Sequence, residues 1–344
     1  MQEILKVEDL QVSINTPQGK VQAVRGVNFT LQEGEVLAII GESGSGKSML
    51  CKSILKLLPS HATIEKGKIW LQGADISAYS QQQMNALRGN VCSAIFQNAP
   101  ASLNPTICIG KQIEQAYAHT LSKQQTTKQE LYKQSIDLLR LVGISNPQVR
   151  YAMYPHQLSG GMCQRIALAI ALACKPMVIF ADEPTTALDV TTQAQILQQL
   201  KKIQKDQKMA MVFVSHDIAT VAGIADRVAI MYAGKIVEIG TAEEIYYQPA
   251  HPYTQVLMQC LPILAQKGKP LPVIEGSPPN LIQPILGDAF AERNPYALEI
   301  DYQQQPPMFQ ISESHFAATW LLDKRAFNLN KSVEGGENTC KHQS

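Results

Sequence analysis

Short apolar segments alternate with longer amphipathic ones along the first two thirds of the chain. Residues 177–181 and 211–214 are apolar runs between polar turns, a pattern typical of buried parallel strands. Further strands are predicted at 4–14, 36–40, 68–71 and 91–96. Helices are predicted at 48–58, 111–142, 166–174 and 191–205. This alternation predicts an α/β fold with helices on the faces of a sheet.

The pattern changes near Gly240, after which prolines become frequent. Seven prolines lie between residues 249 and 279, and they exclude long helices there. We therefore predict a main domain over 1–240 and a proline-rich C-terminal extension over 241–327. Residues 328–344 are polar and rich in Gly, Glu and Lys, which predicts a disordered tail.

Composition narrows the class of protein. The chain has 344 residues, 45% of them hydrophobic, which suits one large domain with a smaller one, or two domains. A net charge of +1 gives no electrostatic basis for a nucleic-acid partner. Seven scattered cysteines without a Cys-x-x-Cys pair favour reduced thiols in the cytosol. The N-terminus lacks a signal-peptide pattern, and no apolar run reaches the about 20 residues of a membrane span, so we expect a soluble protein.

The segment 41–48, Gly-Glu-Ser-Gly-Ser-Gly-Lys-Ser, matches the phosphate-loop pattern and lies between a predicted strand and a predicted helix. Its glycines and backbone N–H groups can surround a β-phosphate. Lys47 is expected to reach the β- and γ-phosphates, and the Ser48 hydroxyl to bind Mg²⁺. The nucleotide-binding residues predicted here are Gly41, Glu42, Ser43, Gly44, Ser45, Gly46, Lys47 and Ser48.

Two carboxylates end the apolar run 178–181. Asp182 is expected to hold Mg²⁺, directly or through water, and Glu183 to act as the general base toward an attacking water. A strand followed by an acidic turn without catalytic function is the alternative.

Residues 158–165, Leu-Ser-Gly-Gly-Met-Cys-Gln-Arg, form a second glycine-containing motif. Ser159 suits a helix N-cap, and Gly160 and Gly161 let backbone N–H groups approach an anion closely. The apolar run that follows is predicted to form a helix whose positive end faces a phosphate. A capped helix that binds nothing is the alternative.

Taken in order, the motifs resemble those of the ATP-binding cassette family over residues 4–240. The resemblance implies a P-loop nucleotide-binding domain, in which a mixed sheet with a RecA-like core carries an inserted helical subdomain at about 98–165. It also implies a dimer, in which each ATP lies between the phosphate loop of one chain and the signature, 158–165, of the other. ATP and Mg²⁺ are thus the expected ligands.

The same resemblance assigns four more residues. Gln97 corresponds to a glutamine that senses Mg²⁺ and the attacking water, and it is expected to contact the metal. His216 corresponds to a histidine that contacts the γ-phosphate. Asp189 ends the segment Ala-Leu-Asp that crosses the dimer interface, and Gln164 belongs to the signature.

Two positions depart from the family pattern. Ile14 stands where many members stack an aromatic ring on adenine, so apolar contact with the base is expected in place of stacking. Cys163 stands where close relatives often carry arginine, which removes a cation near the expected interface.

Five stretches resemble the oligopeptide/dipeptide permease branch, in particular its D-type ATPase subunit: 96–105, 181–190, 251–254, 276–279 and 315–322. The resemblance implies an importer with a second ATPase subunit, two transmembrane permeases and an extracellular peptide-binding protein. It favours a heterodimer of ATPase subunits. The chain is then a peripheral protein on the cytoplasmic face of the cell membrane.

Other functions remain open. A nickel or metallophore importer is the alternative within the family, although such systems commonly lack the long extension. A soluble cassette ATPase that remodels nucleic acid or ribosomes, and a regulatory subunit that binds ATP without hydrolysing it, are alternatives from other classes.

The extension carries one further clue. Many relatives place the cysteines of an iron–sulfur cluster there, and the matching positions in this chain are Asp288, Asn294, Asp301 and Thr319. None supplies a thiolate, so no iron–sulfur cluster is predicted. Asp288, Asp301 and His315 have donor atoms for another metal, but hydrogen-bonded replacement is the expectation.

Overall fold

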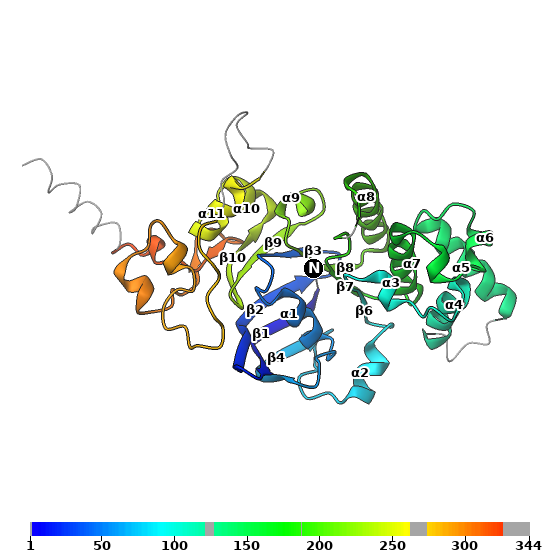
Figure 1. Ribbon diagram of the computed structural model, residues 1–344, viewed down its shortest axis with the longest axis horizontal. Coiled ribbons are helices and arrows are strands. Elements are labelled where there is room, and N and C mark those ends of the chain that lie inside the picture. The colour runs from blue at the N-terminus through cyan, green and yellow to red at the C-terminus, as the bar shows by residue number, and fades with distance from the viewer. Residues whose placement is uncertain (1, 121–126, 187, 262–273, 326–344) are drawn as a thin grey trace, which may run out of the picture.

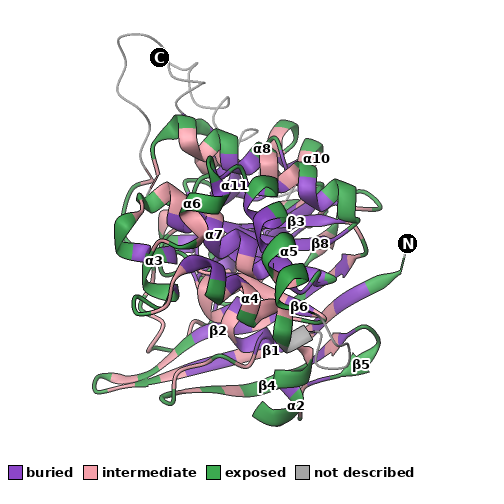
Figure 2. Cartoon of the chain, turned by 90° about the vertical axis from the view of Figure 1, so that its right-hand side faces the viewer, coloured by how far each residue is buried: buried purple, intermediate pink, exposed green. Residues whose placement is uncertain are grey.

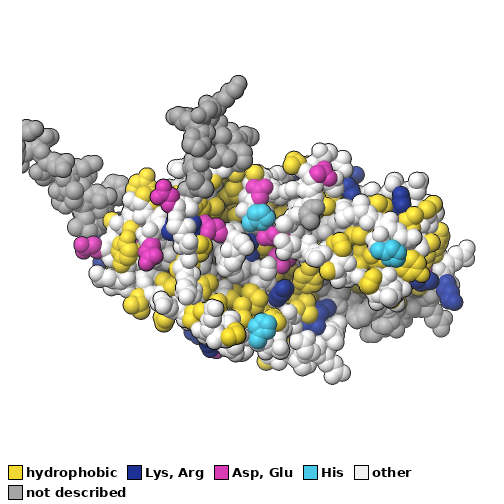
Figure 3. All heavy atoms as spheres, viewed as in Figure 1, with side chains coloured by type: hydrophobic (Ala, Val, Ile, Leu, Met, Phe, Trp, Pro, Cys, Tyr) yellow, Lys and Arg dark blue, Asp and Glu magenta, His cyan; other side chains and the backbone are white. Residues whose placement is uncertain are grey.

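The computed structural model describes residues 2–120, 127–186, 188–261 and 274–325. The tail predicted to be disordered, 328–344, lies outside these ranges. Figure 1 shows a central sheet with a second sheet below it, a group of helices on one side and the C-terminal region on the other. On the face shown in Figure 3, basic and acidic side chains are scattered rather than gathered by sign, in keeping with the small net charge.

The central sheet has eight strands in the order β11-β12-β10-β9-β3-β8-β7-β6. Five of them pair in parallel: β3 (Val36–Ile40), β6 (Cys92–Ile95), β7 (Val178–Asp182), β8 (Ala210–Ser215) and β9 (Arg227–Tyr232). The remaining three pair antiparallel at one edge: β10 (Lys235–Thr241), β11 (Phe309–Gln310) and β12 (Phe316–Ala317). The predicted α/β fold is therefore confirmed, with a mixed sheet.

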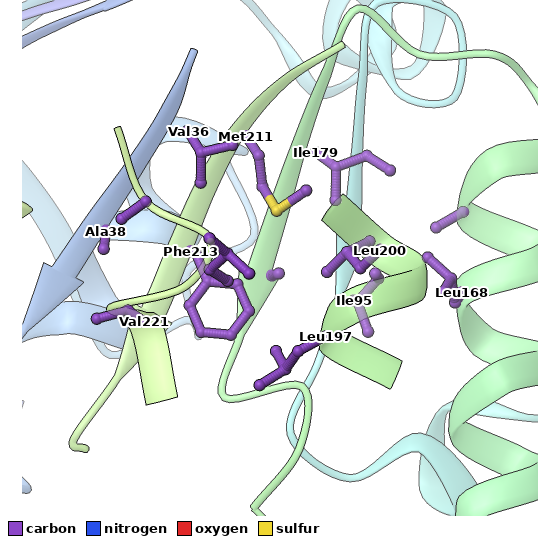
Figure 4. Close-up of a cluster of buried hydrophobic side chains, with 14 of the residues drawn as sticks. Val36, Ala38, Ile95, Leu168, Ile179, Leu197, Leu200, Met211, Phe213 and Val221 are labelled. Carbon is purple, nitrogen blue, oxygen red and sulfur yellow. The ribbon is translucent and has the colours of Figure 1, made fainter. Parts of the chain in front are cut away.

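Burial on both faces explains why the central strands are continuously apolar. Every residue of β3, β7 and β8 is buried. Val36 and Ala38 of β3 pack on one face with Met211, Phe213 and residues of α7 (Gly160–Ala173) and α8 (Val190–Gln207), as Figure 4 shows. Leu37 and Ile39 pack on the opposite face with α1 (Lys47–Ile54).

The second sheet is antiparallel, with strand order β2-β1-β4-β5. Its strands are β1 (Glu3–Thr16), β2 (Gly19–Gln32), β4 (Ala62–Leu71) and β5 (Ala74–Asp75). The buried residues of β1, β2 and β4 share a core with α1 and with the face of the central sheet that carries Leu37 and Ile39. α1 ends earlier than predicted, because Lys56 takes a left-handed conformation with φ 54° soon after Ile54.

A group of helices lies between β6 and β7 in the chain. It comprises α3 (Ala99–Ser102), α4 (Ile109–Thr120), α5 (Lys128–Leu141), α6 (Pro147–Tyr151) and α7. The stretch 111–142 thus includes two helices, and α5 starts at a capping box formed by Thr127 and Glu130. Figure 2 shows that burial concentrates in β3, β8 and α7, whereas the outer helices carry exposed positions.

The C-terminal part packs against the central sheet. Its described residues include α10 (Ala242–Tyr247), α11 (Pro252–Gln259), the short strands β11 and β12, and the single-turn 3₁₀ helices Ala291–Arg293, Glu299–Tyr302 and Trp320–Leu322. The buried carboxylate of Glu238 on β10 accepts hydrogen bonds from the Ala250 and His251 N–H groups and lies 2.7 Å from His315 Nε2. Gly240 lies within β10, so the division at residue 240 stays a prediction.

Three shorter helices complete the described part of the chain: α2 (Gln81–Leu87), α9 (Ile218–Val221) and the 3₁₀ turn Pro155–Gln157 before α7. Among the described residues, none of the helices combines the length and apolar character needed to cross a membrane.

Candidate nucleotide-binding site

The segment 41–46 connects β3 to α1, the strand-loop-helix context that a phosphate loop requires. Glycine is needed at two of its positions by close packing. A Cβ on Gly41 would lie 2.0 Å from the Met231 carbonyl oxygen, and a Cβ on Gly46 would lie 2.2 Å from that of Ala23. Gly46 also has φ +103°, so the loop is held in a shape that only glycine allows.

Lys47 begins α1 and is almost completely buried, at 4% exposure. Its Nζ donates to the carbonyl oxygens of Gly41 at 2.8 Å and of Glu42 at 2.9 Å. Burial lowers the pKa of Lys47, and the carboxylates of Glu183 and Asp182 oppose that shift. The Lys47 ammonium group is therefore held inside the loop, where the negative charges of Glu183 and Asp182 favour its protonated form.

Ser48 and Asp182 meet across the site. The Ser48 hydroxyl donates to Asp182 Oδ1 at 2.9 Å, and Asp182 is 5% exposed. Burial raises the pKa of Asp182, whereas the Ser48 hydrogen bond lowers it. A buried carboxylate beside a hydroxyl fits a hard cation such as Mg²⁺, which prefers oxygen ligands and whose charge would stabilise the ionised form.

Glu183 lies at the centre of the remaining predicted catalytic residues. Its Oε2 accepts hydrogen bonds from Gln97 Nε2 at 3.0 Å and from Thr186 Oγ1 at 2.8 Å, and its Oε1 lies 3.2 Å from His216 Nδ1. Its own backbone has φ 47°, in the left-handed region that non-glycine residues seldom adopt. Such strain is typical of functional sites, because it fixes a side chain in one direction.

These residues line one cleft of about 480 Å³. Among the predicted site residues the cleft includes Ile14, Ser43, Gly44, Gly46, Lys47, Ser48, Gln97, Glu183 and His216. Ile14 lies on β1 opposite Val21 of β2, so the antiparallel sheet provides an apolar wall. Asp182 reaches the cleft through its hydrogen bond to Ser48.

The cleft also includes residues that the sequence did not single out: Val21, Ala23, Met49 and Thr186. Thr186 lies in a turn three residues after Glu183. This short spacing is the local signal that could have predicted its hydrogen bond to Glu183. Val21 and Ala23 lie on β2, a strand that the sequence analysis did not predict.

The signature residues lie elsewhere in the described structure and do not line this cleft. Ser159 caps α7 by accepting from the Met162 N–H at 3.3 Å, as predicted. A Cβ on Gly160 would meet no atom of the described residues within 4 Å, whereas one on Gly161 would lie 3.1 Å from Thr192. Asp189 caps α8 by accepting from the Thr192 N–H at 2.9 Å, so the two segments are neighbours.

Two signature side chains point into the protein. Gln164 is 5% exposed, and its Nε2 has no hydrogen-bond partner among the residues that the structure describes. Cys163 is 2% exposed in the main core, with its Sγ 3.6 Å from the Pro155 carbonyl oxygen. The side chain at position 163 is therefore part of the core of this chain, and the expected change of charge near an interface stays a prediction.

The positions matched to cluster cysteines are occupied by hydrogen-bonding residues. Asp288 Oδ1 accepts from the Phe290 N–H, and Asp301 Oδ2 accepts from the Leu298 N–H. Asn294 Oδ1 accepts from the Tyr296 N–H, and Thr319 caps the turn Trp320–Leu322. Within the described ranges, no three His, Cys, Asp or Glu residues are grouped so that they could hold a metal ion.

Comparison with known proteins gives two matches to protein families. Residues 24–186 match the model described as "ABC transporter", and residues 237–300 match "Oligopeptide/dipeptide transporter, C-terminal region". The second match covers most of β10, all of α10 and α11, and part of the region after them.

Individual proteins resemble the chain along most of its length. It is 48% identical to the oligopeptide transport ATP-binding protein OppD of Bacillus subtilis (strain 168), over 93% of this chain and 89% of that protein. It is 46% identical to the dipeptide transport ATP-binding protein DppD of Lactococcus lactis subsp. cremoris (strain MG1363), over 96% and 94%.

A solved structure shares the fold. The dimeric ATP-binding cassette MJ0796, in a post-hydrolysis state bound to ADP and Pi, is 27% identical and superposes with a TM-score of 0.62, over 69% of this chain and 98% of that one. Together with the sequence matches, this likeness shows that the chain is an ATP-binding protein of the ABC transporter family, in the branch that carries the oligopeptide/dipeptide transporter C-terminal region.

Proposed function

We propose that this chain is the ATP-hydrolysing subunit of an importer of oligopeptides. The observation that carries the catalytic part is the meeting of Gln97, Glu183 and His216 at the mouth of the phosphate-loop cleft. The peptide part is supported by the relatives, which are named as oligopeptide and dipeptide transport ATP-binding proteins, and by the matching C-terminal region. These matches favour peptides over nickel or a metallophore.

In the proposed mechanism, the phosphate loop binds the nucleotide and Lys47 exchanges its two carbonyl partners for phosphate oxygens. Ile14 gives the base an apolar contact. Mg²⁺ would be held by Ser48, Asp182 and the amide oxygen of Gln97, and it would supply positive charge against the phosphates. The amide nitrogen of Gln97 already donates to Glu183, so its oxygen is available for this role.

Glu183 is the proposed general base. Hydrogen bonds from Gln97 and Thr186 hold its Oε2, and the strained backbone fixes the direction of the side chain. The carboxylate then takes a proton from the attacking water, while His216 contacts the γ-phosphate. None of these steps involves residues 158–165 of the same chain. The signature of each chain would therefore act at the ATP site of the other chain.

The proposed assembly follows from this division. Ser159, Gly160, Gly161, Gln164 and Asp189 would complete the site of a second ATPase subunit, with a heterodimer favoured. The pair would bind two transmembrane permeases at the cytoplasmic face of the membrane, and an extracellular peptide-binding protein would deliver the substrate. Closure of the dimer on ATP would drive the permeases, and hydrolysis would reset them.

The catalytic proposal is tested with Glu183→Gln. We expect ATP hydrolysis to fall by at least about a hundredfold, because a general base contributes about that much, while ATP binding stays near normal. Glu33→Gln is the matched control, since Glu33 is exposed and lies outside the cleft. Hydrolysis near the wild-type rate in Glu183→Gln would remove this residue from the role.

The transport proposal needs the intact complex. The chain should be purified from membranes with its neighbouring subunits, and the complex reconstituted in vesicles with ATP enclosed in the lumen and with the peptide-binding protein and labelled oligopeptide outside. ATP-dependent uptake of a labelled oligopeptide is the expected result. Uptake of nickel without uptake of peptide would support the alternative importer, and co-purification with ribosomes would support a soluble remodelling ATPase.

A further inference from the structure

The C-terminal region touches the phosphate loop directly. Arg293, which ends the turn Ala291–Arg293, directs its guanidinium group at Glu42. Nη1 lies 3.0 Å from Glu42 Oε2, and Nη2 lies 3.1 Å from Glu42 Oε1. This is a two-pronged arginine–carboxylate pair, the geometry that combines strength with a fixed orientation.

The backbone of the same loop residue is held by a second C-terminal side chain. The Glu42 N–H donates to the Tyr253 hydroxyl at 3.0 Å, and Tyr253 is fully buried in α11. Both ends of Glu42 are therefore fixed by residues that lie more than 200 positions later in the chain. We refer to Arg293 and Tyr253 as the loop anchor.

Arg293 is itself rigidly placed. Its Nε donates to the Glu275 carbonyl oxygen at 2.8 Å, and its Nη1 donates to the Tyr232 hydroxyl at 3.0 Å. The guanidinium carbon lies 5.7 Å from the centre of the Tyr232 ring and 5.9 Å from that of Phe290. With its side chain 5% exposed, Arg293 has little freedom to follow Glu42 if the C-terminal region moves.

Glu42 connects the anchor to the nucleotide site. Its carbonyl oxygen accepts from Lys47 Nζ at 2.9 Å and from the Ser45 N–H at 3.2 Å. Its carboxylate is a negative charge within the loop that is proposed to bind phosphates. Without Arg293, this carboxylate would be unpaired, and it would repel an approaching polyphosphate.

We propose that Arg293 is a positioning residue for ATP, through which the C-terminal region fixes the phosphate loop and neutralises Glu42. The inference rests on the proposed function of the loop in binding ATP. It gives the C-terminal region a definite role in nucleotide affinity. A partner or a conformational change that displaces Arg293 lowers the affinity for ATP without touching the catalytic groups.

The test compares ATP binding and hydrolysis by the full-length chain and its variants. Arg293→Ala should weaken ATP binding about tenfold, equal to about 1.4 kcal/mol, with kcat at saturating ATP within about twofold of wild type. Arg325→Ala is the matched control, because Arg325 is an exposed arginine of the same region paired to Asp323. It should leave both quantities unchanged.

A second substitution separates charge compensation from general damage. Glu42→Gln removes the repelling charge, so Arg293→Ala combined with Glu42→Gln should recover at least half of the lost affinity. A merely structural role of Arg293 predicts no such recovery, because both changes then add. Unchanged affinity in Arg293→Ala, or no recovery in the double variant, would overturn the inference.

Arg293→Lys covers the case in which Arg293→Ala does not fold. Lysine keeps the charge and loses the two-pronged contact, so an affinity between those of wild type and Arg293→Ala is expected. Wild-type affinity in Arg293→Lys would overturn the inference in that case, because loss of the two-pronged contact would then have no effect on ATP binding. A different result would contradict the proposed function, namely that the wild-type chain itself does not bind ATP.

Discussion

The phosphate loop and the signature segment both place glycines at the start of a helix, and yet the chain surrounds them differently. A Cβ on Gly46 would collide with the Ala23 carbonyl oxygen, whereas one on Gly160 would meet no atom within 4 Å in the part of the chain that the structure describes. Lys47 is 4% exposed, whereas Ser159 and Gly160 are exposed. The loop is thus completed by its own chain, while the signature presents an open surface.

This difference bears on what each segment can do. Close packing fixes the loop, because β2, β9 and the C-terminal anchor all meet it. In the signature, the buried side chain of Cys163 and the cap that Ser159 makes on α7 hold the segment, whereas Gly160 is exposed. Substitution of the closely packed loop glycines should therefore damage both fold and function, whereas substitution of the exposed Gly160 in the signature should damage function alone.

The largest expected effect comes from Gly46→Ala. The added Cβ would lie 2.2 Å from a backbone oxygen, and φ +103° is unfavourable for alanine, so we expect a loss of at least about 2 kcal/mol in unfolding free energy and no measurable ATP binding. Chemical denaturation and equilibrium ATP binding measure the two quantities.

Gly73→Ala is the control for backbone strain alone. Gly73 has φ +75°, but its Cβ would meet nothing within 4 Å. This variant should lose stability and still bind ATP normally. If Gly46→Ala were as stable as wild type, the close packing of the loop would not be essential.

Gly160→Ala tests the exposed segment instead of the closely packed one, and it is expected to have the next largest effect. Because the added methyl group meets no atom of the described residues within 4 Å, the unfolding free energy should stay within about 0.5 kcal/mol of wild type. ATP hydrolysis by the assembled complex should fall about a hundredfold, since the methyl group would occupy space needed by the nucleotide on the partner. Full hydrolysis by this variant would argue against a role for Gly160 at a shared site.

The loop depends on the C-terminal region, and Asp288 offers a pH test of that region. Burial raises the pKa of Asp288 to about 6, compared with 3.8 for a free aspartate. The folded state therefore binds the proton more tightly than the unfolded state, and stability falls as the pH rises from 3.8 to about 6.

Asp288→Asn should remove this loss of stability at higher pH. We expect a gain of about 1–2 kcal/mol in unfolding free energy at pH 7.5, and little or no gain at pH 4. Asp323→Asn is the control with the opposite sign, because the hydrogen bond from Arg325 lowers the pKa of Asp323 to about 2. If Asp288→Asn raised the unfolding free energy equally at pH 7.5 and pH 4, the charge of Asp288 would not be the cause of the gain.

The sequence predicted the parts of the site that have local signals. Apolar runs located β3, β6, β7 and β8, and Glu183 directly follows β7. Gln97 and His216, which lie against Glu183, were assigned by the family resemblance, and Thr186 was not predicted. Parallel strands end at one edge of a sheet, so residues distant in sequence, such as Gln97 and His216, come together there.

The parts that were not predicted depend on contacts between distant segments. β11 and β12 have two residues each and exist through pairing with β10, so no periodic pattern could reveal them. Arg293 and Glu42 are 251 positions apart, and neither lies in a pattern that points to the other. β2 is different, because Gly19–Gln32 has buried positions that alternate over part of its length and could have been recognised.

The smallest expected effect distinguishes a helix cap from a ligand contact at Ser159. Ser159 and Ser80 make the same cap, each accepting from the N–H three residues later at 3.3 Å. Ser159→Ala and Ser80→Ala should therefore each cost about 1 kcal/mol of unfolding free energy. Only Ser159→Ala should also slow ATP hydrolysis by the complex, because only the cap of α7 lies on the surface proposed to face a partner's nucleotide. If both variants hydrolysed ATP at the same rate, Ser159 would be a cap and no more, and the open surface of the signature would have to act through its backbone N–H groups alone.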